Sequence, residues 1–192
     1  MNKPSSNIAF TPNVKALQER FGSRGAYSKM EERGGFQVEI TDDLIAFIGE
    51  RDSFYLATAT KDGQPYIQHR GGPKGFLRVI DHHTLAFGDF RGNRQYISFG
   101  NLGENDKVCL FLMDYVNRRR IKIWGTAKVV EDDPDLIEKV NCPSYRSKPE
   151  RVFVIDVKAW DVNCPQHITP RYTEIEIESL EICDGCEPKS SN

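Results

Sequence analysis

The residues of this sequence that are best suited to chemistry are cations and glycines near the expected ends of strands. They occur in three segments, 71–75 (Gly-Gly-Pro-Lys-Gly), 91–94 (Arg-Gly-Asn-Arg) and 118–120 (Arg-Arg-Arg). Arginine can form paired hydrogen bonds to phosphate, and glycine leaves backbone N–H groups open to an anion. The pattern predicts a site that holds a phosphorylated ligand against a sheet.

The segment 91–94 is the strongest candidate within this region. We expect residues 91–101 to form a short helix, so that N–H groups at its start and the guanidiniums of Arg91 and Arg94 could bind a dianionic phosphate. The inward side chains of this helix are expected to be Tyr96, Ile97 and Phe99. The alternative is a basic helix start that is simply solvated.

The arginine run at 118–120 offers further cations. Alternation along a strand should place Arg118 and Arg120 on one face and Arg119 on the other. We expect Arg119 or Arg120 to reach the ligand, and the alternative is a solvated strand end.

Two further groups of residues could carry chemistry near the C-terminus. His167 and Arg171 lie in a proline-containing loop and could bind an anionic substrate or relay a proton, although packing at a dimer edge would explain them equally well. Cys164, His167, Cys183 and Cys186 have the spacing of a tetrahedral zinc site. A redox dithiol and inert thiols are the alternatives for the two C-terminal cysteines.

Composition narrows the class of protein. The 192 residues include 26 Lys and Arg against 28 Asp and Glu, so no strong overall field draws the chain to nucleic acid or to anionic lipid. No apolar run approaches the roughly 20 residues of a membrane helix, and no signal-peptide pattern is present. Five cysteines do not indicate a secreted disulfide framework. We expect a cytoplasmic protein.

The chain divides into three parts. Residues 1–35 are expected to be an extension with one helix over about 14–30, residues 36–180 a single folded domain, and residues 181–192 a polar tail. Helices are expected at 42–51, where Thr41 can cap the first turn, and at 132–140, where Pro134 occupies an early position. A loop should begin at 159 and lead to a short helix over 173–179.

Hairpins dominate the rest of the sequence. Residues 54–60 and 65–69 flank an Asp-Gly turn, and residues 76–80 and 84–87 form a second pair. Further strands are expected at 108–113, 121–130 and 152–157. About six short strands with peripheral helices predict a mainly β protein, a small antiparallel barrel.

Three segments resemble a known family. Residues 71–76 (GGPKGF), 89–98 (DFRGNRQYIS) and 164–171 (CPQHITPR) are similar to those of the pyridoxamine 5′-phosphate oxidase-like flavoproteins, and the resemblance extends from about Phe10 to Glu178. It implies a six-stranded split β-barrel homodimer with FMN bound at the subunit interface. It also implies an FMN-dependent oxidoreductase, with a reduced nicotinamide nucleotide as a candidate electron donor. The substrate-phosphate pattern of the oxidase itself is replaced by Cys-Pro-Gln-His at 164–167, so oxidation of pyridoxamine phosphate is not expected.

The resemblance assigns roles to individual residues. It places FMN on the strand and turn from Gln68 to Lys74, on the segment after Phe87 and Gly88, and under the arginine run. The expected cofactor-binding residues are therefore Gln68, Arg70, Lys74, Phe87, Gly88, Arg91, Gly92, Asn93, Arg94, Arg119 and Arg120. His167 and Arg171 are the expected substrate contacts, and no metal ligand is assigned. Storage or sensing of FMN, or binding of a deazaflavin or haem without turnover, remains open.

Overall fold

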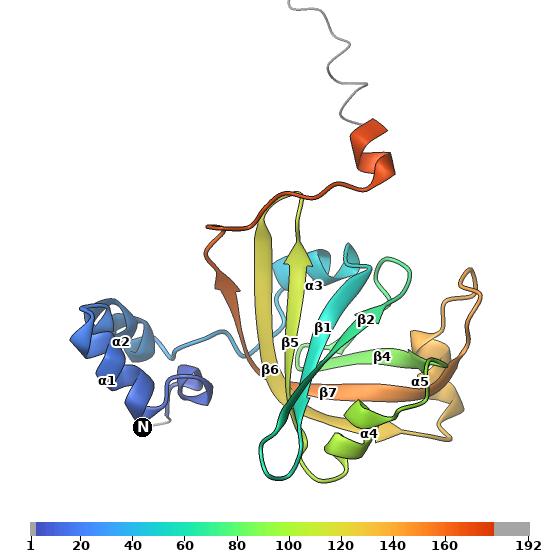
Figure 1. Ribbon diagram of the computed structural model, residues 1–192, viewed down its shortest axis with the longest axis horizontal. Coiled ribbons are helices and arrows are strands. Elements are labelled where there is room, and N and C mark those ends of the chain that lie inside the picture. The colour runs from blue at the N-terminus through green and yellow to red at the C-terminus, as the bar shows by residue number, and fades with distance from the viewer. Residues whose placement is uncertain (1–2, 179–192) are drawn as a thin grey trace, which may run out of the picture.

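The computed structural model describes residues 3–178, and its centre is one antiparallel sheet rolled into an open barrel (Figure 1). The strands lie in the order β2-β1-β5-β6-β7-β4-β3, so β2 and β3 are the two edges. The described residues thus form seven strands, one at each of the seven segments expected to be strands, although the barrel was expected to have about six. Their bounds are β1 Ser53–Ala59, β2 Pro65–Gly71, β3 Arg78–Asp81, β4 Thr84–Phe90, β5 Lys107–Asp114, β6 Arg119–Val130 and β7 Pro149–Asn163. The expected mainly β, split-barrel class is confirmed.

Aromatic rings fill the interior of the barrel. Phe54 of β1 contacts Phe87 of β4 edge to face, with centroids 5.2 Å apart, and Phe87 stacks on Phe153 of β7 at 4.9 Å. All three side chains are fully buried. The contact between β1 and β4, which are not neighbours in the sheet, requires the sheet to curl until its inner faces meet.

Local signals place several elements as expected. Thr41 caps helix α3, Asp42–Gly49, by accepting a hydrogen bond from the Leu44 N–H. Asp133 caps α5, Pro134–Val140, in the same way with the Leu136 N–H. The hairpin of β1 and β2 turns at Gly63, whose φ of 89° suits glycine. These features depend on neighbours in sequence, which is why the sequence predicted them.

The N-terminal extension differs from the single helix expected at 14–30. It has a short 3-10 helix at Ser5–Ile8 and two α-helices, α1 at Pro12–Arg20 and α2 at Arg24–Glu32. The break falls at Gly22, where a φ of 77° ends the helical path. Figure 1 shows this helical pair outside the barrel. Phe36, which follows it, stacks on Trp124 of β6 with centroids 5.2 Å apart.

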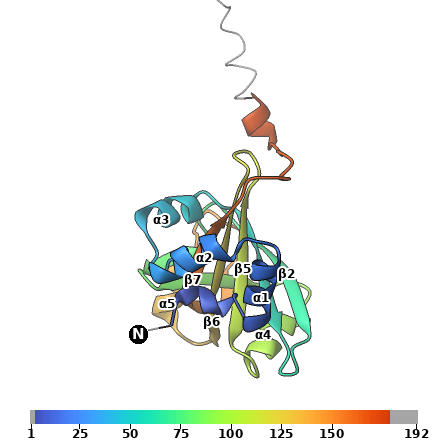
Figure 2. The same ribbon diagram turned by 90° about the vertical axis from the view of Figure 1, so that its left-hand side faces the viewer.

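Two further expectations are corrected at the ends of strands. The helix expected at 91–101 is shorter, α4 at Ile97–Leu102, because Tyr96 before it adopts a left-handed φ of 57°. Tyr96 and Ile97 are exposed rather than inward. Strand β7 continues to Asn163, beyond the 152–157 expected, because it pairs with the whole length of β6. After β7 the chain runs past the β5–β6 turn and away from the barrel (Figures 1 and 2).

We predict that Gly125→Ala destabilises the protein by about 2–4 kcal/mol, because a Cβ at this position collides with the backbone carbonyl oxygen of Asp156. The site lies where the register of β6 and β7 shifts. Urea unfolding measures the free energy of unfolding.

The matched control is Gly25→Ala, a glycine within α2 whose added Cβ meets open space. This change should be neutral or stabilise the protein by up to about 1 kcal/mol. Similar effects from both substitutions would contradict the close strand contact.

Candidate functional site

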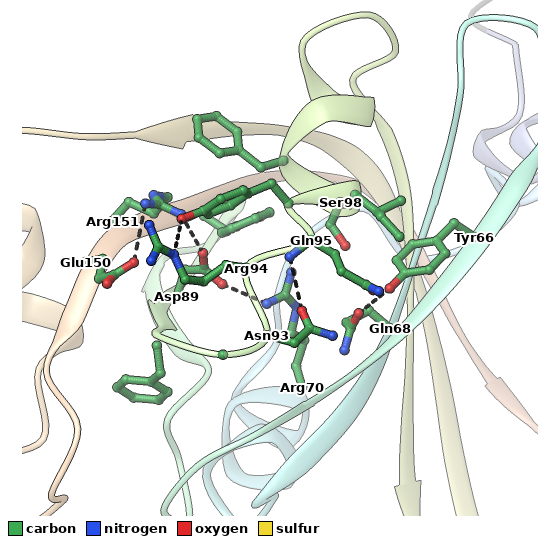
Figure 3. A pocket seen from close by; sticks show the side chains of 16 residues that line it. Tyr66, Gln68, Arg70, Asp89, Asn93, Arg94, Gln95, Ser98, Glu150 and Arg151 are labelled. Carbon is green, nitrogen blue, oxygen red and sulfur yellow. Dashed lines mark hydrogen bonds and ion pairs between the residues drawn. The ribbon is translucent and has the colours of Figure 1, made fainter.

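A cavity of about 220 Å³ lies where the two sides of the barrel meet (Figure 3). Residues of β2, β4, β7, α4 and the loop between β4 and α4 surround it. Its lining comprises Tyr66, Gln68, Arg70, Asp89, Phe90, Gly92, Asn93, Arg94, Gln95, Tyr96, Ile97, Ser98, Phe99, Glu150, Arg151 and Phe153. Three arginines against two acidic residues leave this lining with an excess of positive charge.

One carboxylate joins the two sides. Asp89 Oδ1 lies 2.7 Å from a terminal nitrogen of Arg70, and Asp89 Oδ2 lies 3.2 Å from a terminal nitrogen of Arg151. All three side chains are largely buried. Asp89 and Arg151 are direct cross-strand partners on β4 and β7. Arg70 comes from β2, which four strands separate from β4 in the sheet, so its ion pair spans the split in the barrel.

Both guanidiniums also lie over aromatic rings. Arg70 is 5.0 Å from the ring centroid of Phe153, and Arg151 is 5.2 Å from that of Phe99. Such contacts hold a guanidinium plane in place without satisfying its N–H groups. The Nε of Arg70 is buried and makes no hydrogen bond among the described residues. The Nε of Arg151 forms an ion pair with Glu131 Oε1 at 3.4 Å. Arg70 thus gives the cavity a fixed donor without an acceptor.

The loop from β4 to α4 bends around the cavity. Arg94 and Tyr96 both have left-handed backbone conformations, with φ of 61° and 57°. Asn93 Oδ1 accepts a hydrogen bond from the Gln95 N–H at 3.2 Å. Arg94 Nε donates to the Tyr96 hydroxyl oxygen at 3.2 Å, and this bond lowers the pKa of Tyr96. Left-handed residues in a loop turn backbone N–H groups toward one side, which favours an anion.

Comparison with known protein families identifies the family to which this fold and cavity belong. The family profile described as pyridoxamine 5′-phosphate oxidase matches residues 40–164, well over half of the chain. The chain belongs to the pyridoxamine 5′-phosphate oxidase family. The matched span contains the whole sheet, the cavity and the loop before α4. The suspected resemblance is therefore confirmed.

Solved structures share the fold at low sequence identity. HupZ from Group A Streptococcus is similar with a TM-score of 0.52 and 18% identity, over 69% of this chain and 99% of that one. A candidate pyridoxamine 5′-phosphate oxidase from Lactobacillus delbrueckii has a TM-score of 0.50 and 20% identity, over 65% of this chain and 95% of that one. At these identities the likeness concerns the fold alone. Among curated proteins, no sequence matches the chain.

The structure gathers part of the predicted cofactor site around this cavity. Gln68, Arg70, Gly92, Asn93 and Arg94 all line it. Arg91, by contrast, is exposed and is not part of the lining. The loop residues also precede α4 rather than starting it, so the expected role of helix N–H groups near Arg91 and Arg94 is corrected.

Two other predicted residues lie behind the cavity wall. The Phe87 ring belongs to the buried core, and Arg70 covers it at 5.6 Å from the ring centroid. Gly88 is buried, and a Cβ there would meet the side chain of Pro149. Both residues therefore support the cavity from the core side without lining it.

Three further predicted cations lie at a second cavity, of about 1010 Å³, between α3, the β5–β6 turn and the segment after β7. It contains Lys74, Arg119 and Arg171. Arg119 lies 5.3 Å from the ring centroid of Phe47, and Arg171 lies 4.9 Å from that of Tyr115. Lys74 forms an exposed ion pair with Glu50 at 3.4 Å.

A buried carboxylate stands at the base of this second cavity. Burial alone raises the pKa of Asp114, but hydrogen bonds from Asn117 and the charge of Arg51 outweigh it, so the pKa lies below its usual value. The Asn117 N–H donates to Asp114 Oδ1 at 3.0 Å, and its side-chain amide donates to Oδ2 at 2.9 Å. The ionised group thereby fixes the β5–β6 turn beside Arg119.

The last predicted residues lie outside both linings. Arg120 is half-buried on β6, and Arg118 has a left-handed φ of 52° in the turn, so strand alternation begins only at Arg119. His167 is exposed in the segment after β7, with φ of 63°. In the part of the chain that the structure describes, no three His, Cys, Asp or Glu side chains form a metal-binding group. Cys183 and Cys186 lie outside the described residues.

Sequence reasoning missed the residues that hold the cavity together. Asp89 stood within a quoted motif but received no role, and Arg151, which precedes a predicted strand, received none. They are 62 positions apart, so only the pairing of β4 and β7 brings them together. The sequence feature that could have indicated a role for Asp89 is its position as the one acidic residue next to a cationic, glycine-containing segment.

Among the residues that the structure describes, no helix has both the length and the apolar character needed to cross a membrane.

We predict that Asp89→Asn destabilises the protein by about 3 kcal/mol, because it leaves Arg70 and Arg151 close together without their shared carboxylate. Thermal and urea unfolding at neutral pH measure the loss.

The control is Glu50→Gln, which breaks the exposed ion pair to Lys74. This substitution should change the free energy of unfolding by no more than about 0.5 kcal/mol. Equal effects of the two substitutions would show that the pairs across the split contribute no more than a surface contact.

Proposed function

We propose that this member of the family is a flavoprotein that binds FMN, with the phosphate in the cavity lined by Arg70, Arg94 and Arg151. The observation that carries the proposal is the set of fixed guanidiniums beneath a loop with left-handed residues. A phosphate monoester is about doubly negative and offers several acceptor oxygens, which suits these guanidiniums and the unpaired Nε of Arg70.

The size of the cavity supports a particular arrangement. Pockets for whole ligands usually hold about 300–1,000 Å³. At about 220 Å³, this one is suited to a phosphate and the adjoining chain rather than to a complete flavin nucleotide. The ring would then extend along the edge strand β2, past Gln68. The outer face of the flavin ring would then have to be covered by residues that do not belong to this cavity.

A second copy of the chain is our proposed cover. The outer face of the sheet carries Ile67, 65% exposed, and Tyr55, 38% exposed, on the neighbouring strands β2 and β1. Phe111 of β5 lies opposite Tyr55. An exposed apolar sheet face of this kind supports a homodimer. The cations of the second cavity and the segment after β7 would then approach the partner's ligand.

We further propose that the protein is an oxidoreductase. Bound FMN supplies hydride and electron transfer, so the chain needs no nucleophile of its own. Its residues would anchor the phosphate, exclude water from the ring and position a small substrate. Arg171 and His167, in the segment that leaves the barrel, are proposed to contact that substrate.

Anaerobic reduction tests the activity. The protein reconstituted with FMN should lose its visible flavin absorbance when NADH or NADPH is added, and regain it with an electron acceptor. If dithionite bleaches the bound flavin but neither NADH nor NADPH changes its absorbance, the result would favour a flavin carrier over an oxidoreductase. A protein that cannot be reconstituted with FMN would contradict the cofactor assignment.

We predict that Arg94→Ala weakens FMN binding by about 1.5–3 kcal/mol, because it removes a charge-assisted hydrogen bond at the phosphate. Quenching of flavin fluorescence on titration measures the dissociation constant. Riboflavin, which lacks the phosphate, should bind the variant and the parent protein alike.

The control is Arg33→Ala, an exposed arginine at the end of α2. It removes the same charge from the chain and should leave FMN affinity unchanged. If both variants lose affinity equally, a general field rather than a local contact attracts the ligand.

A further inference from the structure

Ser98 is a buried hydroxyl for which the fold provides no partner. Its residue is only 4% exposed, and its Oγ makes no hydrogen bond among the described residues. A buried hydroxyl without a partner costs stability. Serine near the start of a helix usually pairs with nearby backbone, which makes the isolation of this one a reason to look for a ligand.

The position of Ser98 points to where that ligand would lie. It is the second residue of α4 and lines the cavity at the split, together with Arg70 and Arg151. Figure 3 shows its hydroxyl directed into the cavity, on the side of Gln95 and Arg70. The helix is held in place, because Asn101 donates a buried hydrogen bond of 2.9 Å to Thr58 Oγ1 of β1.

Two residues that line this cavity therefore each have a buried polar atom without a hydrogen-bond partner among the described residues. The atoms are Ser98 Oγ and Arg70 Nε. The Nε of Arg151, by contrast, is ion-paired with Glu131 Oε1 at 3.4 Å. A hydroxyl can donate, and a guanidinium N–H can only donate. A group with several acceptor oxygens and negative charge satisfies both atoms, whereas an apolar or cationic group satisfies neither.

We propose that Ser98 is a phosphate ligand of this site, donating its hydroxyl hydrogen to an oxygen of a phosphate monoester between the two guanidiniums. This inference rests on the proposed FMN function and adds to it. The motif at 91–94 attracts the phosphate from the solvent side, and Ser98 binds it from the helix side. Ser98 then distinguishes the phosphorylated flavin from its unphosphorylated form.

The test uses Ser98→Ala in the full chain, titrated separately with FMN and riboflavin. FMN affinity should fall about ten-fold, the effect of losing one hydrogen bond to a charged group. Riboflavin affinity should stay the same. The melting temperature of the ligand-free variant should equal or exceed that of the parent by a few degrees, about 2–4 °C, because an unsatisfied hydroxyl has been removed.

The melting temperature separates a ligand from a structural residue. A hydroxyl that supported the fold would lower the melting temperature of the ligand-free protein when removed, and this result would overturn the inference. Ser23→Ala, at an exposed serine without a side-chain capping bond, is the control and should change neither affinity nor stability.

Comparison of FMN with riboflavin distinguishes a failure of this inference from a failure of the proposed function on which it rests. If the parent protein prefers FMN to riboflavin and Ser98→Ala keeps the full preference, the role of Ser98 is wrong while the phosphate site stands. If the parent binds both flavins equally, the phosphate site and the role of Ser98 are both contradicted.

Discussion

The ion pairs of Asp89 across the split of the barrel are the interaction on which the site depends. In the part of the chain that the structure describes, the edge strands β2 and β3 are not paired with each other, so no strand pairing closes the barrel. The carboxylate of Asp89 instead joins Arg70 of β2 to Arg151 of β7. Ion pairs can hold the two sides of the split together without filling the space between them. A cavity therefore remains where continued strand pairing would leave none.

The same network determines the electrostatic character of the cavity. Asp89 offsets one of the two guanidiniums that it holds, and Arg151 also forms ion pairs with Glu131 and Glu150, each at 3.4 Å. Arg94 adds a further cation from the loop. Because the donors are fixed by aromatic contacts and by strand pairing, little reorganisation is needed when an anion enters. Stability and the proposed phosphate binding thus depend on the same arginines.

The two cavities have separate sets of cations. Lys74, Arg119 and Arg171 lie at the β5–β6 end of the barrel, and Arg70, Arg94 and Arg151 lie at the split. In the proposed homodimer, the first set would serve the ligand of the partner. The segment after β7 extends away from its own barrel, as this arrangement requires (Figure 1).

The sequence by itself determined the features that depend on near neighbours. The Thr41 cap, the helix start at Pro134 and the Asp-Gly turn at Gly63 were all predicted, because capping and turn geometry act over three or four residues. The family was also readable from three short segments, and the profile match confirmed it.

Only the tertiary structure decided which of these residues share a site. Asp89 and Arg151 meet because β4 pairs with β7, and Arg70 joins them because the sheet curls. The left-handed conformation of Tyr96 moved the start of α4 to Ile97 and brought Ser98 to the cavity. Strand pairing and sheet curvature act between residues distant in sequence, and no local pattern of side chains records them.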